Sequence, residues 1–132
     1  MIPLTRLASY NGIPVSQFLS QEQLDKVAAD TMVGGATLTG LLGTSAWYAP
    51  GASVAYLVDS ILNDQKKMIA CSVFVEGEYG QNDICIGVPC IIGKNGIEEI
   101  IDIKLNDAEK ALFAKSADAV RSMNDALATV LG

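Results

Sequence analysis

The side chains that could carry chemistry are few, and histidine is not among them. The 132 residues contain no histidine, the side chain most often used for proton transfer near neutral pH, so neither a Ser-His nor a Cys-His pair can form. No Gly-x-Gly-x-x-Gly stretch follows an expected strand, and a dinucleotide-binding fingerprint is therefore missing as well. On its own the chain is expected to hold neither a general base nor a cofactor loop.

Paired carboxylates occur twice and raise the question of acid/base catalysis by two acids. Glu76 and Glu78 flank Gly77 at the end of an expected strand. Glu98 and Glu99 are adjacent in a strand, so their side chains should point to opposite faces. We interpret both pairs as solvated surface groups.

The three cysteines are odd in number and form no Cys-x-x-Cys pair, which favours neither a disulfide framework nor a metal site. Cys71, Cys85 and Cys90 lie inside apolar, β-branched runs without an evident basic neighbour that would lower a thiol pKa. Buried, inert thiols are expected.

Aromatic and hydroxyl side chains meet at Thr44-Ser45-Ala46-Trp47-Tyr48, where they could line a ligand pocket. Packing of Trp47 and Tyr48 in a core or an interface is the favoured alternative. Arg6 could bind a carboxylate through its planar guanidinium, although a lone arginine in such a segment is more often a surface residue.

Composition excludes several classes of partner. The net charge of -6 and the pI near 4.4 argue against binding of nucleic acid, and no apolar run approaches the roughly 20 residues that span a bilayer. Half of the residues are nevertheless apolar, which indicates a surface that meets another domain or subunit. The length fits one domain, and the absence of a secretory pattern at the N-terminus favours a reducing, cytoplasmic location.

Helical patterns occupy three regions. A capping box at Ser20 and Gln23 predicts a helix over 21–33 that ends at Gly34-Gly35, followed by another helical piece at Leu38 to Leu42. The dense apolar block 46–63 predicts a buried helix with Pro50 in its first turn, small alanines on one face and Leu57, Ile61 and Leu62 in a core. A cap signal from Asn106 to Glu109 begins a long helix over 107–130.

Short β-branched runs at 68–75, 84–92 and 97–103 predict three strands. The Asn95-Gly96 pair is a strong hairpin signal, so the second and third strands should be antiparallel. All three should be antiparallel, since their turns are too short for a crossover helix. Residues 1–19 should be extended or turning, since they contain Pro3, Pro14 and Asn11-Gly12. The predicted fold is α+β, with helices, a small antiparallel sheet and a long C-terminal helix.

Five stretches, in order along the whole chain, resemble landmarks of the malate dehydrogenase branch of the lactate/malate dehydrogenase family: Met1-Ile2-Pro3-Leu4, Asn11-Gly12-Ile13-Pro14, Thr44-Ser45-Ala46-Trp47-Tyr48-Ala49-Pro50, Glu76-Gly77-Glu78-Tyr79-Gly80 and Gly87-Val88-Pro89-Cys90-Ile91-Ile92-Gly93-Lys94-Asn95-Gly96-Ile97. The resemblance implies that residues 1–132 are the C-terminal, substrate-side domain of an NAD-dependent enzyme that interconverts malate and oxaloacetate. The N-terminal NAD-binding Rossmann domain is then absent from this chain.

The resemblance also implies which site residues are here. The family's catalytic histidine, its substrate-binding arginines and its glycine-rich cofactor loop lie upstream of Met1, so no catalytic residue is carried over. Ser45 and Ala46 would face the 2-hydroxy or 2-oxo acid substrate, and Pro50 would face the nicotinamide. Many relatives have an additional glycine between Thr44 and Ser45, and tyrosine in place of Trp47.

Residues 46–63 match a helix that in the family meets the other subunit's cofactor domain, which implies a homo-oligomer. Two alternatives stay open. One is a non-catalytic binding or assembly module that uses residues 46–63, and the other is the equivalent half of a lactate dehydrogenase, because only Tyr48-Ala49-Pro50 favours malate.

Overall fold

The computed structural model describes residues 1–131, which form the α+β arrangement expected from the sequence. The chain divides into two compact units, Met1–Pro50 and the part from Gly51 onward, and each is described by itself. Among the described residues, no helix is both long and apolar enough to cross a membrane.

The N-terminal segment turns repeatedly, as its prolines and Asn-Gly pair predict. Two 3-10 turns, η1 (Thr5–Leu7) and η2 (Val15–Gln17), flank a hairpin of two-residue strands, β1 (Ser9–Tyr10) and β2 (Ile13–Pro14). The hairpin turn is Asn11-Gly12, with φ of 50° and 82°. Left-handed conformation at both positions is the type I′ pattern that Asn-Gly favours.

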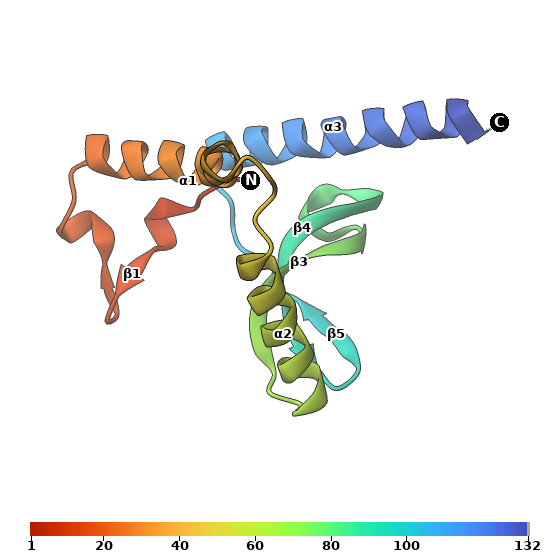
Figure 1. Ribbon diagram of the computed structural model, residues 1–132, viewed down its shortest axis with the longest axis horizontal. Coiled ribbons are helices and arrows are strands. Elements are labelled where there is room, and N and C mark those ends of the chain that lie inside the picture. The colour runs from red at the N-terminus through yellow and green to blue at the C-terminus, as the bar shows by residue number, and fades with distance from the viewer. Residues whose placement is uncertain (132) are drawn as a thin grey trace. The chain divides into compact units, whose positions relative to one another are not determined.

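Helix α1 (Gln21–Leu42) begins where the sequence indicates and ends later (Figure 1). The Ser20 hydroxyl accepts a hydrogen bond from the Gln23 amide at 3.3 Å, and the Gln23 side chain accepts one from the Ser20 amide at 2.8 Å. The predicted end at Gly34-Gly35 is wrong. Glycine there costs some helix propensity but imposes no break, and the helix ends where Gly43 takes a φ of 70° and donates to the Thr39 carbonyl.

Three antiparallel strands form the sheet in the order β3 (Lys67–Glu76), β4 (Asn82–Gly93) and β5 (Gly96–Ile100). The predicted pairing is confirmed, but β5 is shorter than expected. The Ile101 amide still donates to the Pro89 carbonyl of β4 at 2.9 Å, and the Tyr79 hydroxyl then donates to the Ile101 carbonyl and accepts from the Ile103 amide at 2.9 Å.

The turn between β4 and β5 differs in detail from the expected Asn95-Gly96 turn. Gly93 pairs with Gly96, so Lys94 and Asn95 are the two turn residues. Gly96 alone has a left-handed φ, of 85°, at the first position of β5. This is the arrangement of a turn followed by a glycine bulge, in which glycine is required one position later than in a type I′ turn.

One face of the sheet is buried and the other is open. Exposure alternates along β4, where Ile84, Ile86, Val88, Cys90 and Ile92 are all buried. Val73 and Val75 of β3 pair with Ile86 and Ile84 on the same face. The opposite face carries exposed residues that include Met68, Phe74 and Cys85.

Helix α2 (Tyr48–Leu62) contains Pro50 in its first turn, as expected, but it is not the buried helix that the sequence predicts. Ser60 is its only buried residue among those described, and its hydroxyl donates to the Ile92 carbonyl at 2.9 Å. Leu57 and Ile61 are half-buried beside it, whereas Leu62 is 77% exposed and fills no core. The helix therefore packs by one narrow stripe and leaves most of its apolar surface uncovered.

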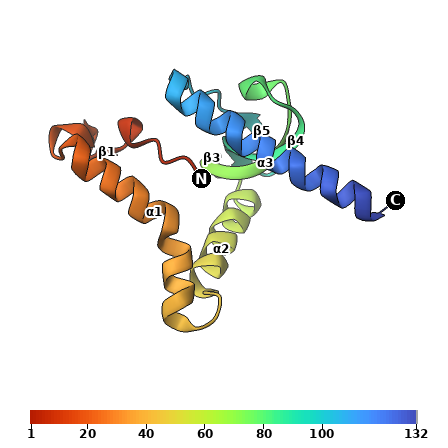
Figure 2. The same ribbon diagram turned by 90° about the horizontal axis from the view of Figure 1, so that it is seen from above.

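Helix α3 (Asp107–Leu131) lies alongside β4 in both views (Figures 1 and 2). Its start is capped as predicted: Asn106 accepts from the Glu109 amide, and Glu109 accepts from the Asn106 amide, each at 2.9 Å. Phe113 and Ala117 are buried, and the Phe113 ring lies 5.2 Å from the Tyr79 ring. These contacts fix the first half of the helix to the sheet.

The cysteines differ in their surroundings. Cys90 is buried, as expected, and burial raises its thiol pKa to about 11, with Cys71 nearby as a smaller cause. The expectation of buried thiols is wrong for Cys85, which is exposed, and Cys71 is half-buried. The reason is strand alternation, which puts Cys85 and Cys90 on opposite faces of β4.

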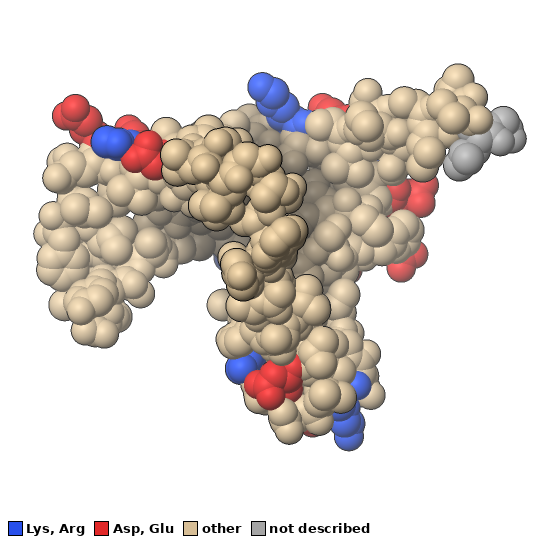
Figure 3. All heavy atoms as spheres, viewed as in Figure 1, with Lys and Arg blue, Asp and Glu red and all other residues tan. Residues whose placement is uncertain are grey.

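Charged groups gather where α2 ends and the β4–β5 hairpin turns (Figure 3). Glu98 and Glu99 are exposed, as expected, but Glu98 is ion-paired with Lys66. Asp64 accepts from the Lys94 amide at 2.9 Å and lies 3.0 Å from the Lys66 ammonium. The Lys94 hydrogen bond, aided by Lys66, lowers the pKa of Asp64.

We expect Gly93→Ala to destabilise the chain. A Cβ at Gly93 would lie 2.5 Å from a Glu98 carboxylate oxygen and 2.8 Å from one of Asp64, so both carboxylates must move from their partners. Because these oxygens end flexible side chains that can turn away, the loss is confined to their contacts with Lys66 and the Lys94 amide, and Gly93→Ala should unfold at a lower urea concentration than its control. Gly87→Ala, on the same strand with open space at the added Cβ, is the control and should be neutral or stabilising. Equal stability of the two variants would contradict this account.

We also expect Tyr79→Phe to lower the free energy of unfolding by about 1 to 3 kcal/mol, because two partly buried backbone groups lose their partner while the ring contact with Phe113 remains. Urea denaturation followed by circular dichroism measures the change. Tyr10→Phe, at an exposed tyrosine, should have no effect. A Tyr79→Phe protein as stable as the parent would show that the hydroxyl does not hold residues 101–103.

Candidate functional site

The segment that carries the candidate site residues connects two helices. Gly43 ends α1, residues 45–47 have no regular structure, and α2 begins at Tyr48. Ser45 and Ala46 are therefore in the connection, and Pro50 is the third residue of α2. A proline is tolerated there because amides in the first turn have no partner within the helix.

The surroundings of these three residues are open and uncharged. Ser45 and Pro50 are exposed and Ala46 is half-buried. No Asp, Glu, Lys or Arg occurs from Gly43 to Ser53. Small side chains, a hydroxyl and a proline ring can offer a neutral contact surface and one hydrogen-bonding group, but no proton acceptor that works near neutral pH.

Trp47 and Tyr48 do not pack in a core. The two residues are 66% and 88% exposed, so packing in a core is wrong for this chain, whereas packing in an interface stays a prediction. Arg6 is an exposed residue, as expected.

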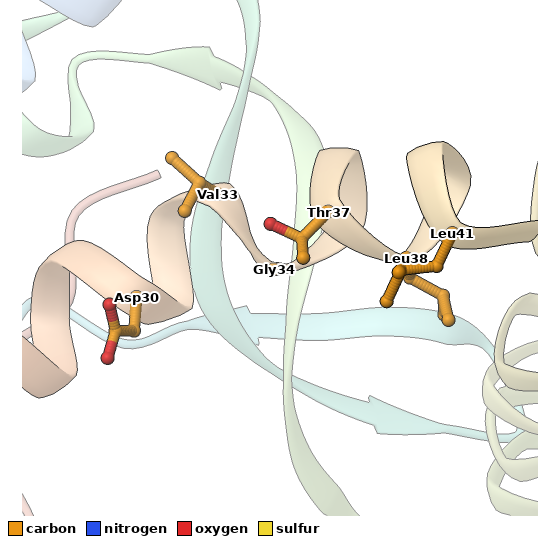
Figure 4. A pocket seen from close by; sticks show the side chains of 6 residues that line it. All are labelled: Asp30, Val33, Gly34, Thr37, Leu38 and Leu41. Carbon is orange, nitrogen blue, oxygen red and sulfur yellow. The ribbon is translucent and has the colours of Figure 1, made fainter.

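A shallow hollow of about 300 Å³ runs along α1 and is lined by that helix alone (Figure 4). Its lining residues are Asp30, Val33, Gly34, Thr37, Leu38 and Leu41. All are exposed, and the single carboxylate of Asp30 is paired with Lys26 at 2.7 Å. The hollow is an uncovered apolar helix face and has no converging polar groups of the kind that orient a small ligand.

Uncovered apolar side chains extend over all three long helices. On α1 and α2 they are Val27, Met32, Val33, Leu38, Leu41, Leu42, Val54, Tyr56, Val58 and Leu62, and on α3 they are Leu112, Met123, Leu127 and Val130. Soluble monomers rarely leave so many large apolar side chains of their helices open. These helices have the composition of elements that are covered by other protein.

Sequence reasoning missed the residues that organise the second unit. Tyr79 holds residues 101–103, Ser60 attaches α2 to β4, and Arg121 donates to the Gln81 side chain and to the Asn82 carbonyl. Lys67 lies 4.0 Å from the centre of the Tyr56 ring. Each contact joins residues 11 to 40 positions apart, so no local spacing reveals it.

Comparison with known proteins gives a consistent result. The model of the lactate/malate dehydrogenase, alpha/beta C-terminal domain, matches residues 1–129. Malate dehydrogenase of Flavobacterium frigidimaris is 91% identical over 131 residues, covering 99% of this chain and 42% of that protein. The corresponding protein of Flavobacterium johnsoniae is 90% identical with the same coverage.

Solved structures that resemble this chain come from the same family. Malate dehydrogenase from Salinibacter ruber matches 98% of this chain with a TM-score of 0.96 and 40% identity, over 43% of its own length. Lactate dehydrogenase from Eimeria maxima matches 97% with a TM-score of 0.93 and 39% identity, over 42% of its length.

The chain thus spans about two fifths of the relatives it matches, and the family model runs across both of its compact units. This chain belongs to the lactate/malate dehydrogenase family, as its alpha/beta C-terminal domain.

Proposed function

We propose that the chain is the substrate-side half of an NAD-dependent malate dehydrogenase, which interconverts malate and oxaloacetate together with an N-terminal Rossmann domain. The observation that carries the proposal is the 91% identity to a malate dehydrogenase over nearly the whole chain. Both Flavobacterium relatives and the Bacteroides relatives carry the same name, which favours malate over lactate.

Within that enzyme, Ser45, Ala46 and Pro50 would form one wall of the active site. The exposure of Ser45 and Pro50, the position of all three residues before or in the first turn of α2, and the absence of charge around them support this role. Ser45 would offer a hydroxyl to the substrate, and Ala46 would leave room for it. The wall would exclude water from one side of the reacting atoms and contribute no group that takes up the proton.

NAD would be bound mainly by the other domain, since this chain has no glycine-rich phosphate loop. This chain would offer NAD only a contact surface. Pro50 presents an exposed, uncharged ring at the start of α2 for that contact. When bound, NAD supplies the acceptor and donor of hydride. Pro50 would limit where the nicotinamide can lie.

The exposed face of residues 46–63 would be covered in a homo-oligomer. Ala49, Ala52 and Ala55 are exposed small residues that allow another helix to approach closely, and Val54, Tyr56 and Val58 add apolar area. Covering such surface is worth on the order of 25 cal/mol per Å² before the costs of association. The enzyme would be located in the cytoplasm, a reducing compartment in which free thiols such as those of this chain persist.

The first test is an assay of NAD-dependent oxidation of malate and lactate. The 132-residue chain alone should show no turnover, because a general base and a cofactor loop are missing. Fusing it to the remaining, N-terminal part of the Flavobacterium frigidimaris malate dehydrogenase should restore oxidation of malate and not of lactate. Turnover by the chain alone, free of full-length enzyme, would refute the view that catalysis depends on the other domain, and a folded fusion that prefers lactate would refute the substrate.

The second test concerns the apolar face of α2. The isolated chain should self-associate, and Ala52→Glu should weaken that association about tenfold or more while far-UV circular dichroism stays unchanged, since a charge would be buried in the contact. Ser53→Glu, which adds the same charge at a neighbouring exposed polar position, is the control and should have a smaller effect. Light scattering measures both, and a parent chain that remains monomeric at high concentration would contradict the proposed contact.

A further inference from the structure

Two Asn-Gly pairs in this chain occupy turns with different surroundings. Asparagine followed by glycine is the sequence most open to spontaneous deamidation, because glycine has no side chain to hinder attack by its own amide nitrogen. Asn11-Gly12 connects β1 and β2, and Asn95-Gly96 lies at the β4–β5 turn. Whether either reacts depends on how freely the turn can rearrange.

The Asn11-Gly12 turn is held weakly. Its two strands have two residues each, and no residue from Met1 to Gln17 is buried. Gly12 lies outside both strands, so its amide belongs to the turn and not to the ladder. Among the described residues, no hydrogen bond to the Asn11 side chain is found. Opening of this hairpin therefore disturbs almost no packing.

The Asn95-Gly96 turn is held by strand pairing, by two hydrogen bonds and by buried neighbours. Gly96 is the first residue of β5 and pairs with Gly93, so its amide is part of the ladder. The Asn95 side chain donates to the Glu98 carboxylate at 3.4 Å, and the preceding Lys94 amide donates to Asp64 at 2.9 Å. The adjoining Ile92 and Gly93 are buried. Rearrangement here requires that part of the sheet open.

We propose that Asn11 is a site of spontaneous deamidation in the folded chain and that the β4–β5 hairpin protects Asn95 from the same reaction. The Gly12 amide nitrogen loses its proton to base and attacks the side-chain carbonyl carbon of Asn11. A carbon–nitrogen bond closes a succinimide, and the side-chain nitrogen leaves as ammonia. Water then adds to either imide carbonyl, which gives aspartate or isoaspartate.

The modification has a defined structural effect. It adds one negative charge to a chain whose net charge is already -6. The isoaspartate product also inserts an additional backbone carbon into a two-residue turn, which breaks the pairing of Tyr10 with Ile13. Because the attacking amide must lose a proton, the rate should rise with pH.

The test is incubation of the chain at mildly alkaline pH, followed by proteolysis and mass spectrometry of the peptides that contain Asn11 and Asn95. In the folded chain, Asn11 should convert at least about fivefold faster than Asn95, the ratio that corresponds to roughly 1 kcal/mol in opening free energy. In concentrated urea the two sites should convert at similar rates, which shows that the difference comes from structure.

Asp64→Ala, which removes the acceptor of the Lys94 amide, should accelerate conversion at Asn95 and leave Asn11 unchanged. Equal or reversed rates in the folded chain would overturn the proposal. So would an Asn11 that stays intact in the folded chain while both sites convert in urea. An Asn95 rate unaffected by Asp64→Ala would overturn the protective role assigned to that hydrogen bond.

Discussion

The ladder between β3 and β4 is the constraint on which the second unit depends. Ten residue pairs fix its register, from Lys67 with Ile92 to Glu76 with Asn82. Since side chains alternate between faces, a slip by one residue would expose the buried row of β4 and bury Cys85 in its place. The hydrogen bond of Ser60 in α2 to the Ile92 carbonyl and the burial of Phe113 in α3 both require this register.

Local sequence patterns predicted most of this fold, because helix caps and strand runs are each contained within a few neighbouring residues. The capping boxes at Ser20 and Asn106 begin their helices where expected, and the three strands pair as expected. Two predictions failed, one where a contact distant in sequence holds the backbone and one where a local signal permits two outcomes. The Tyr79 hydroxyl, and no further strand pairing, fixes the Ile103 amide. Gly34-Gly35 does not end α1, since glycine permits a helix end without requiring one.

The candidate site could be predicted only in part. Spacing alone indicated that aromatic and hydroxyl groups meet near the start of α2, but it did not distinguish a core from a surface, and Trp47 proved exposed. The roles proposed for Ser45, Ala46 and Pro50 rest on family resemblance. No pattern in these residues could supply them, because the groups that would give them a function are expected in another part of the enzyme.

Because Cys85 and Cys90 lie on opposite faces of β4, their reactivities show whether the sheet is intact. Cys85 is exposed to an alkylating reagent in the folded state, whereas Cys90 is fully buried and carries a thiol pKa of about 11, so it holds little reactive thiolate near neutral pH. Modification of Cys90 therefore requires the buried face to open. The labelling kinetics of these cysteines, five positions apart in one strand, measure solvent access and sheet opening in a single unmutated chain.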